Sequence, residues 1–199
     1  MSIRKFPPWR RPPKCRWYHF YVTRAGYVLA GGYSTRMGRD KALLMGGAVA
    51  QAVRQAAGSA TLVGDPERYG SLGYPVIPDL WPGEGPLGGI VTALRHTRED
   101  LNLIVACDMP MLSGIFLEEL LRAAGEGILV PVNAKGRLEP LCAVYPRSAL
   151  PGLETAFAAG IRKVAGAFAG LPVTPYPVAE PSHFQNVNTP EEWAVHDRK

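Results

Sequence analysis

The sequence has no apolar stretch near the length of a membrane helix, and its few cysteines follow no recognisable spacing. No uninterrupted apolar run approaches the roughly 18 residues that a spanning helix requires. The three cysteines, Cys15, Cys107 and Cys142, are odd in number and form no CxxC pair. These absences argue against a membrane protein, a disulfide scaffold and a zinc site. We therefore expect a reduced, cytoplasmic protein.

The patterns of common nucleophilic enzymes and metal centres are missing as well. No Ser-His-Asp or Cys-His arrangement is present, and the four histidines share no ligand spacing. Covalent catalysis by an activated side chain is therefore not indicated.

Acidic residues are absent from residues 1–24, which hold seven of the 22 Lys and Arg residues. Without those seven, 15 basic residues stand against 17 acidic ones, so the remainder carries a net charge of −2. A basic arm with interleaved Trp and Tyr is typical of nucleic-acid binding, and a targeting segment is a second interpretation. Because the segment shows no burial pattern, we favour an extension over residues 1–24 that packs on nothing. Residues 25–199 then form a single domain with no nucleic-acid partner.

From residue 26 onward, apolar runs of strand length alternate with helical patterns. This alternation predicts an α/β fold: a Rossmann-like three-layer sandwich whose mostly parallel sheet has helices on both faces. The expected strands lie within residues 26–31, 60–65, 75–79, 102–108, 127–132 and 139–146. The expected helices lie within residues 48–57, 85–97, 115–124, 149–159 and 161–169, with a last one opening at residue 189. Ligands of such sheets bind beyond the carboxyl ends of the strands, so the residues that follow the strands should converge on one edge.

The stretch LAGGYSTRMGRDKALL, residues 29–44, follows the first of these strands. Gly31 and Gly32 allow close approach of a ligand and leave backbone N–H groups for phosphate oxygens. Arg36 offers a planar fork of donors and Lys41 a mobile positive charge, both suited to phosphate. The stretch is neither a GxxxxGK[ST] loop nor a GxGxxG loop. Asp79 and Asp108 end two further strands, and either residue suits a simple turn as well.

This stretch closely resembles the signature loop L-A-G-G-x-S-x-R-M-G-x-D-K of nucleotidyltransferases, and in particular of the molybdenum cofactor guanylyltransferase family. Further matches follow in the expected order: IPD (residues 77–79), GPLGGI (85–90), CDMP (107–110) and NVNTPEEW (186–193). The resemblance spans residues 25–193 and implies a fold like that of the nucleotide-diphospho-sugar transferases.

The resemblance also implies roles for individual residues. Those expected at the nucleotide are Leu29, Ala30, Gly31, Gly32, Lys41, Asp79, Gly85 and Gly88. Asp108 would bind Mg²⁺, the implied cofactor, and Arg36, Lys41 and Asp108 would form the catalytic set. Arg162, Lys163, Asn186 and Asn188 would face the pterin substrate.

The implied activity is transfer of GMP from GTP to Mo-molybdopterin, by a monomer with transient contacts to molybdenum-cofactor enzymes and chaperones. A cytidylyltransferase acting on the same cofactor is an alternative, although NVNTPEEW favours the guanylyl branch over the D-x-D-T-P of cytidylyl relatives. A nucleotide-binding protein with weakened catalysis is a second alternative.

One departure from the family pattern supports the second alternative. Gly46 and Gly47 lead directly into a predicted helix of only about three turns over residues 48–57, as if several residues were missing. Ala48 also replaces the polar residue usual there. These features predict an incompletely formed phosphate end of the site.

Overall fold

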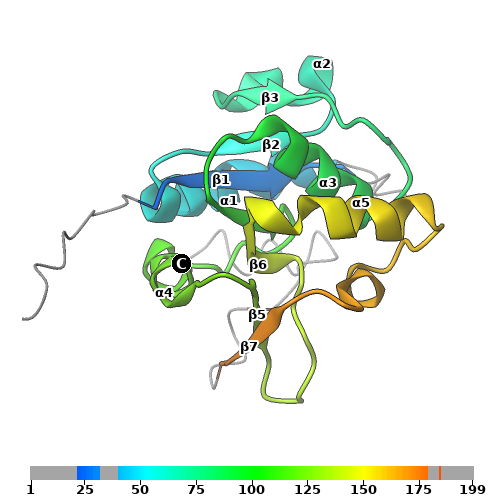
Figure 1. Cartoon of the computed structure of the whole chain (residues 1–199). Helices are drawn as coiled ribbons and strands as arrows, with labels where there is room; N and C mark the ends of the chain where they lie inside the picture. Colours follow the sequence, from blue (N-terminus) through cyan, green and yellow to red (C-terminus); the bar gives the residue numbers. More distant parts are fainter. Residues whose placement is uncertain (1–21, 32–39, 179–183, 185–199) are drawn as a thin grey trace, which may run out of the picture.

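Seven strands among the described residues form one sheet in the computed structural model, which describes residues 22–31, 40–178 and 184 (Figure 1). The strand order is β3-β2-β1-β4-β6-β5-β7. The first four of these strands are parallel, β6 is antiparallel to both neighbours, and β7 is parallel to β5. The predicted mostly parallel sheet is confirmed. The strands are β1 (Arg24–Leu29), β2 (Thr61–Val63), β3 (Val76–Ile77), β4 (Leu101–Ala106), β5 (Ile128–Val132), β6 (Cys142–Pro146) and β7 (Val173–Pro177).

Helices cover both faces of the sheet, which confirms the predicted three layers (Figure 1). The α-helices are α1 (Lys41–Ala57), α2 (Pro66–Tyr69), α3 (Pro86–His96), α4 (Gly114–Ala123) and α5 (Leu150–Ala158). Short 3₁₀ helices are η1 (Gly70–Leu72), η2 (Arg147–Ala149) and η3 (Val164–Phe168). None of these helices has the length and apolar character needed to cross a membrane.

Two hydrophobic cores result from the alternation of side chains along the buried strands. Leu103 and Val105 of β4 belong to the core with α1 and α4, whereas Ile104 between them belongs to the core with α3 and α5. All three side chains are fully buried. Burial on both faces explains why β4 reads as a continuous apolar run.

Helix α1 is longer than the sequence pattern predicted. It begins at Lys41, directly after Asp40, whose Oδ1 accepts a hydrogen bond from the backbone N–H two residues further on (3.0 Å). Gly46 and Gly47 lie inside the helix, so the prediction of a short helix over residues 48–57 is wrong. An N-cap and a buried apolar face outweigh two glycines, each of which costs only about 0.5–1 kcal/mol relative to Ala.

Two further elements differ from the sequence-based expectation. Residues 161–169 form only the short 3₁₀ helix η3 rather than an α-helix, and β7 was not predicted. Pro175 and Pro177 obscure this strand in the sequence, yet an edge strand tolerates prolines because its outer side needs no donors. The helix expected from residue 189 lies outside the described residues.

The first described residues already belong to the fold. The backbone N–H and the hydroxyl of Thr23 both donate to Asp100 Oδ2 (3.0 Å each), and Arg24 pairs with Leu101 in the sheet. Both residues were expected in the N-terminal extension, but Arg24 starts β1 and Thr23 is hydrogen-bonded to the fold directly before it. Residues 1–21 lie outside the described part, so the character of that extension stays a prediction.

Candidate active site

The carboxyl ends of the four parallel strands are aligned by hydrogen bonds from the residue after one strand to the last residue of its neighbour. Ala30 N–H donates to Val63 O (2.9 Å), Gly64 N–H to Ile77 O (2.9 Å) and Cys107 N–H to Leu29 O (3.2 Å). The residues directly beyond, Gly31, Asp79 and Asp108, therefore leave the sheet at one edge. This edge is the candidate active site.

The structure brings Gly31 and Asp79 together at this edge. A Cβ atom at Gly31 would lie 3.8 Å from Asp79 Oδ2, an ordinary contact, and no other described residue lies within 4 Å of it. Gly31 is exposed and does not require a positive φ angle. The fold itself therefore does not need a glycine here, whereas close approach of a ligand would.

Asp79 is oriented by both a turn and the neighbouring helix. Its Oδ1 accepts a hydrogen bond from Trp81 N–H (3.0 Å) and lies 3.1 Å from the hydroxyl of Thr92. These contacts occupy Oδ1 and leave Oδ2 toward Gly31. One carboxylate oxygen of Asp79 therefore stabilises the turn, and the other faces the candidate site.

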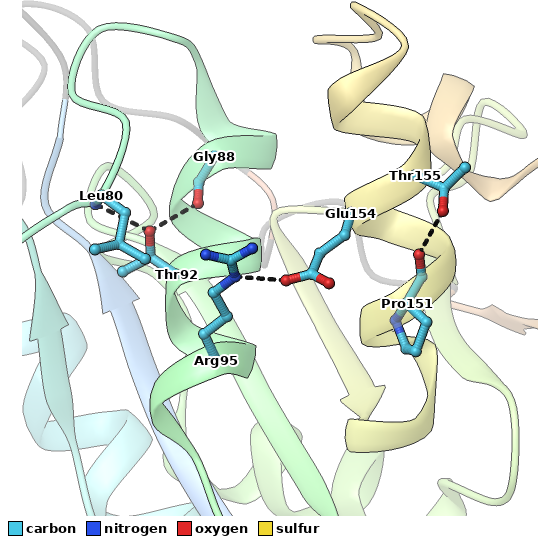
Figure 2. A network of polar contacts seen from close by, with 7 residues as sticks. All are labelled: Leu80, Gly88, Thr92, Arg95, Pro151, Glu154 and Thr155. Atoms are coloured by element: carbon cyan, nitrogen blue, oxygen red, sulfur yellow. Dashed lines mark hydrogen bonds and ion pairs between the residues drawn. The ribbon is translucent and has the colours of Figure 1, made fainter.

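Thr92 is a positioning residue that the sequence analysis missed. It is buried on α3, and its hydroxyl accepts from Leu80 N–H (3.2 Å) and lies 3.0 Å from Gly88 O (Figure 2). One hydroxyl thereby joins the loop that carries Asp79 to the first turns of α3. The available signal was a hydroxyl residue within the apolar stretch of a helix, where it must find hydrogen-bond partners.

Asp40, the N-cap of α1, was also missed. Its Oδ2 lies 2.6 Å from Arg68 Nη2 and accepts a hydrogen bond from the Tyr69 hydroxyl (3.0 Å). Burial, with help from the Asp40 carboxylate, raises the pKa of Tyr69, so the phenol stays protonated and donates. Asp40 is therefore fixed from two sides immediately before Lys41, whose side chain lies outside the described part.

Leu29 and Ala30, expected at the nucleotide, are buried. Their side chains belong to the two cores, so only their backbone atoms are available to a ligand at this edge.

Gly85 is the N-cap of α3 and Gly88 lies in its first turn, and both face residues of α5 or of the segment after it. Gly85 has a φ of 89°, and a Cβ on it would lie 3.9 Å from Arg162 O. Gly88 is buried, and a Cβ there would lie 3.3 Å from Trp81 Cβ and 3.5 Å from Phe157 Cε2. Because Gly88 has no side chain, Trp81 and Phe157 can pack closely against the backbone of α3 at this position.

Arg162 is held by its neighbours rather than directed freely toward the sheet edge. Its Nε lies 2.8 Å from Glu84 Oε2, and Nη1 donates to Phe157 O (2.8 Å). Its guanidinium carbon lies 4.2 Å from the centre of the Phe157 ring. Lys163, next in the chain, is exposed.

Arg162 also lines an open groove of about 450 Å³ beside α3 and α5. Trp81 and Phe157 pack there with ring centres 5.1 Å apart, and Arg95 lies over the Trp81 ring at 4.9 Å. Arg95 is paired with Glu154 of α5 (Figure 2). The charged groups of this groove are thus paired with one another.

Of the remaining predicted site residues, the structure describes only Asp108. Asp108 is half-buried at the end of β4. Gly32, Arg36, Asn186 and Asn188 lie outside the described residues. Within the described part, no group of three or more His, Cys, Asp and Glu residues gathers around a common point.

An α/β sheet with a glycine after β1 and carboxylates after β3 and β4 is the arrangement expected of a nucleotidyltransferase, and the comparison with known proteins assigns the chain to that class. Residues 26–171 match the family model described as the MobA-like NTP transferase domain. The chain belongs to this family.

Relatives with assigned names point the same way. A probable molybdenum cofactor guanylyltransferase of Flavobacterium johnsoniae is 32% identical over 179 residues, which cover 85% of this chain and 94% of that protein. The molybdenum cofactor guanylyltransferase of Rhodobacter capsulatus is 35% identical over 185 residues, covering 85% and 93%. The solved structure of molybdopterin-guanine dinucleotide biosynthesis protein A from Archaeoglobus fulgidus superposes with a TM-score of 0.72 at 30% identity, covering 87% and 97%.

Proposed function

We propose that this protein transfers GMP from GTP to Mo-molybdopterin, forming molybdopterin guanine dinucleotide and pyrophosphate. The observation that carries the proposal is the meeting of Gly31 and Asp79 beside the end of β4, in a chain whose relatives are named guanylyltransferases. The cytidylyl alternative is not favoured by those relatives. The short helix that suggested weakened catalysis is not present, because α1 begins at Lys41 and is capped by Asp40, and this supports an active enzyme.

The bond changes need no side-chain nucleophile. An ionised oxygen of the acceptor's terminal phosphate attacks the α-phosphorus of GTP and forms a new P–O bond. The bond from that phosphorus to the oxygen bridging to the β-phosphate breaks, and pyrophosphate leaves with its electron pair. No proton has to be removed, so the protein's task is to position and neutralise two anionic substrates.

The residues divide between these two substrates. The backbones of Leu29, Ala30 and Gly31, with Asp79, serve the nucleoside, as would Gly32, Gly85 and Gly88. Arg36 and Lys41 serve the phosphates of GTP. Arg162, Lys163, Asn186 and Asn188 serve the pterin, and Arg162 would exchange its pairing with Glu84 to do so.

Mg²⁺ is the divalent ion that we propose for this site. It favours oxygen ligands, keeps several waters, and is usually held by one or two carboxylates together with substrate phosphates. Asp108 fits that donor set, with Asp79 at the same edge as a second carboxylate. When bound, the ion supplies positive charge to the phosphate oxygens during transfer.

We place the reaction in the cytoplasm and propose that a monomer passes its product to molybdenum enzymes and chaperones by transient contact. The test is incubation of the protein with each NTP, Mo-molybdopterin and Mg²⁺, followed by measurement of pyrophosphate and of the dinucleotide. GTP should give the guanine dinucleotide with one pyrophosphate per product.

Each contrary result of that experiment would support a different function. Product from CTP alone would establish the cytidylyl alternative. Metal-dependent GTP binding with no pyrophosphate release would indicate a nucleotide-binding protein without catalysis.

A further inference from the structure

The strand order divides the candidate site into two halves around β4. Gly31 and Asp79 follow β1 and β3, which lie on one side of β4, and β6, β5 and β7 lie on the other side. Asp108 follows β4 itself. If the nucleotide occupies the first half, the second half is open to the phosphate end of the acceptor, and the reacting phosphates can meet between the two halves near Asp108.

A hairpin connects β5 and β6 in this second half, and Figure 1 shows it projecting from the ends of the two strands. Because β6 is antiparallel to β4, the start of β6 lies at the same sheet edge as the end of β4. Leu141, just before β6, accepts a hydrogen bond from Ala106 N–H (2.8 Å), two residues before Asp108. The base of the hairpin therefore lies next to the proposed metal ligand.

The tip of the hairpin is rigidly built. Gly136 N–H donates to Asn133 O (2.8 Å), Asn133 N–H donates to Arg137 O (2.9 Å), and Gly136 has a φ of 74°. This is the three-residue hairpin loop that ends in a glycine bulge. The Asn133 side chain reinforces it, because Oδ1 accepts from the backbone N–H of Lys135 (2.9 Å) and of Arg137 (3.1 Å).

Lys135 and Arg137 are exposed on this tip, and neither forms an ion pair with any described residue. The nearest acidic residue in the hairpin, Glu139, accepts a hydrogen bond from the side-chain amide of Asn133 (2.6 Å) instead. The fold fixes the backbone beneath the two cations, and no described carboxylate neutralises their charges. Cations held on a rigid turn suit an anionic ligand, since little backbone entropy is lost on binding.

On the basis of guanylyl transfer as the activity, we propose that the hairpin over residues 132–141 is the outer wall of the acceptor subsite, where Lys135 and Arg137 bind anionic oxygens of the organophosphate acceptor. Arg137 offers a planar fork to a phosphate and Lys135 a mobile charge. Together they offset the repulsion between the acceptor and the triphosphate of GTP. Both are binding residues for the acceptor, distinct from the groups expected at the nucleotide.

The test is the double variant Lys135→Ala/Arg137→Ala, assayed for guanylyl transfer with Mo-molybdopterin and GTP varied separately. The KM for the acceptor should rise by at least ~10-fold, since two charge-assisted contacts are lost, while the KM for GTP and the melting temperature stay unchanged. The charge-preserving variant Lys135→Arg/Arg137→Lys should restore most of the acceptor affinity.

A matched control removes two cations from the other end of strands β4 and β6, away from the candidate site. Arg98 precedes β4 and Arg147 follows β6, and both are exposed. Arg98→Ala/Arg147→Ala lowers the net charge equally and should leave both KM values unchanged. An equal rise in the acceptor KM for the two double variants would overturn the proposal, because a general field effect would then explain it.

An unchanged acceptor KM in the hairpin variant, with normal wild-type turnover, would also overturn the proposal while leaving the guanylyltransferase activity intact. If the wild-type protein forms no dinucleotide at all, the proposed function fails first. A second variant, Asn133→Ala, loosens the turn without removing charge and should raise the acceptor KM by a smaller factor than the double variant.

Discussion

The carboxylate of Asp40 lies 2.6 Å from the guanidinium of Arg68, where the first turn of α1 meets α2. The same oxygen accepts a hydrogen bond from Tyr69, and the other oxygen caps α1. One side chain therefore joins the helix that begins with Lys41 to the segment that follows β2. This connection fixes where the signature loop ends.

Asp40→Ala should reduce both stability and nucleotide affinity. Loss of an N-cap costs about 1 kcal/mol, and the partner groups left behind add about 1 kcal/mol more. We expect the free energy of unfolding, measured in urea, to fall by about 2 kcal/mol and the KM for GTP to rise. Ser113→Ala removes the N-cap of α4 and is the control. It should cost only about 1 kcal/mol and leave the KM for GTP unchanged.

Asp108→Asn should reduce product formation by at least ~100-fold, about 2.7 kcal/mol of transition-state stabilisation, because it removes the charge that we propose holds the metal. The melting temperature should change little. Asp100→Asn, at the other end of β4, should retain full turnover. If Asp108→Asn unfolds while its folded fraction reacts normally, Asp108 has a structural role and Asp79 becomes the first candidate for the metal ligand.

Lys41→Ala should weaken binding of GTP far more than binding of guanosine, because the ammonium group serves phosphates rather than the base. Isothermal titration with both ligands measures the difference directly. Equal weakening of the two would assign Lys41 to the nucleoside or to the fold.

Thr92→Val should lower GTP affinity although Thr92 is buried away from the nucleotide. The change removes the acceptor of Leu80 N–H and a hydroxyl contact of Asp79, at a cost of about 1–2 kcal/mol in stability. Thr92→Ser keeps the hydroxyl and should restore the KM for GTP. If Ser and Val variants bind GTP equally well, Thr92 does not position Asp79.

Gly47→Ala should stabilise the protein by about 0.5–1 kcal/mol with unchanged activity, because alanine favours a helix interior. Among the described residues, no atom outside the neighbouring residues and the backbone of α1 itself lies within 4 Å of the position that its Cβ would take. A neutral effect would indicate that the helix starts after Gly47. Gly26→Ala provides the contrast, since its Cβ would collide with Val53 and with the backbone of Ser59, and it should destabilise.

The parallel sheet and the convergence of Gly31 and Asp79 could be predicted because they follow from local patterns. Strands β1 to β4 read as apolar runs, and parallel strands bring the residues that follow them to the same end of the sheet. The start of α1 was mispredicted because two glycines suggested a break, whereas the Asp40 cap and tertiary packing decide the boundary. Helix propensity is a weak preference that packing regularly overrides.

The supporting contacts could not be predicted because they join residues far apart in the sequence. Asp40 meets Arg68 and Tyr69 across 28 and 29 residues. Asp79 meets Thr92 across 13 residues. A sequence pattern shows that a polar side chain needs a partner but does not say which element will supply it.

The reversed direction of β6 has a consequence for how such an enzyme can diversify. Antiparallel neighbours can be joined by a short turn, so the β5–β6 connection can be lengthened, shortened or replaced without changing the order of the strands. Strands β1, β2 and β3 have no such freedom, because each leads into a helix. The proposed nucleotide half is therefore tied to the architecture of the sheet, whereas the proposed acceptor half includes a connection that can vary in length and sequence. If the hairpin binds the acceptor as proposed, changes confined to this one connection would alter acceptor recognition without altering nucleotide recognition.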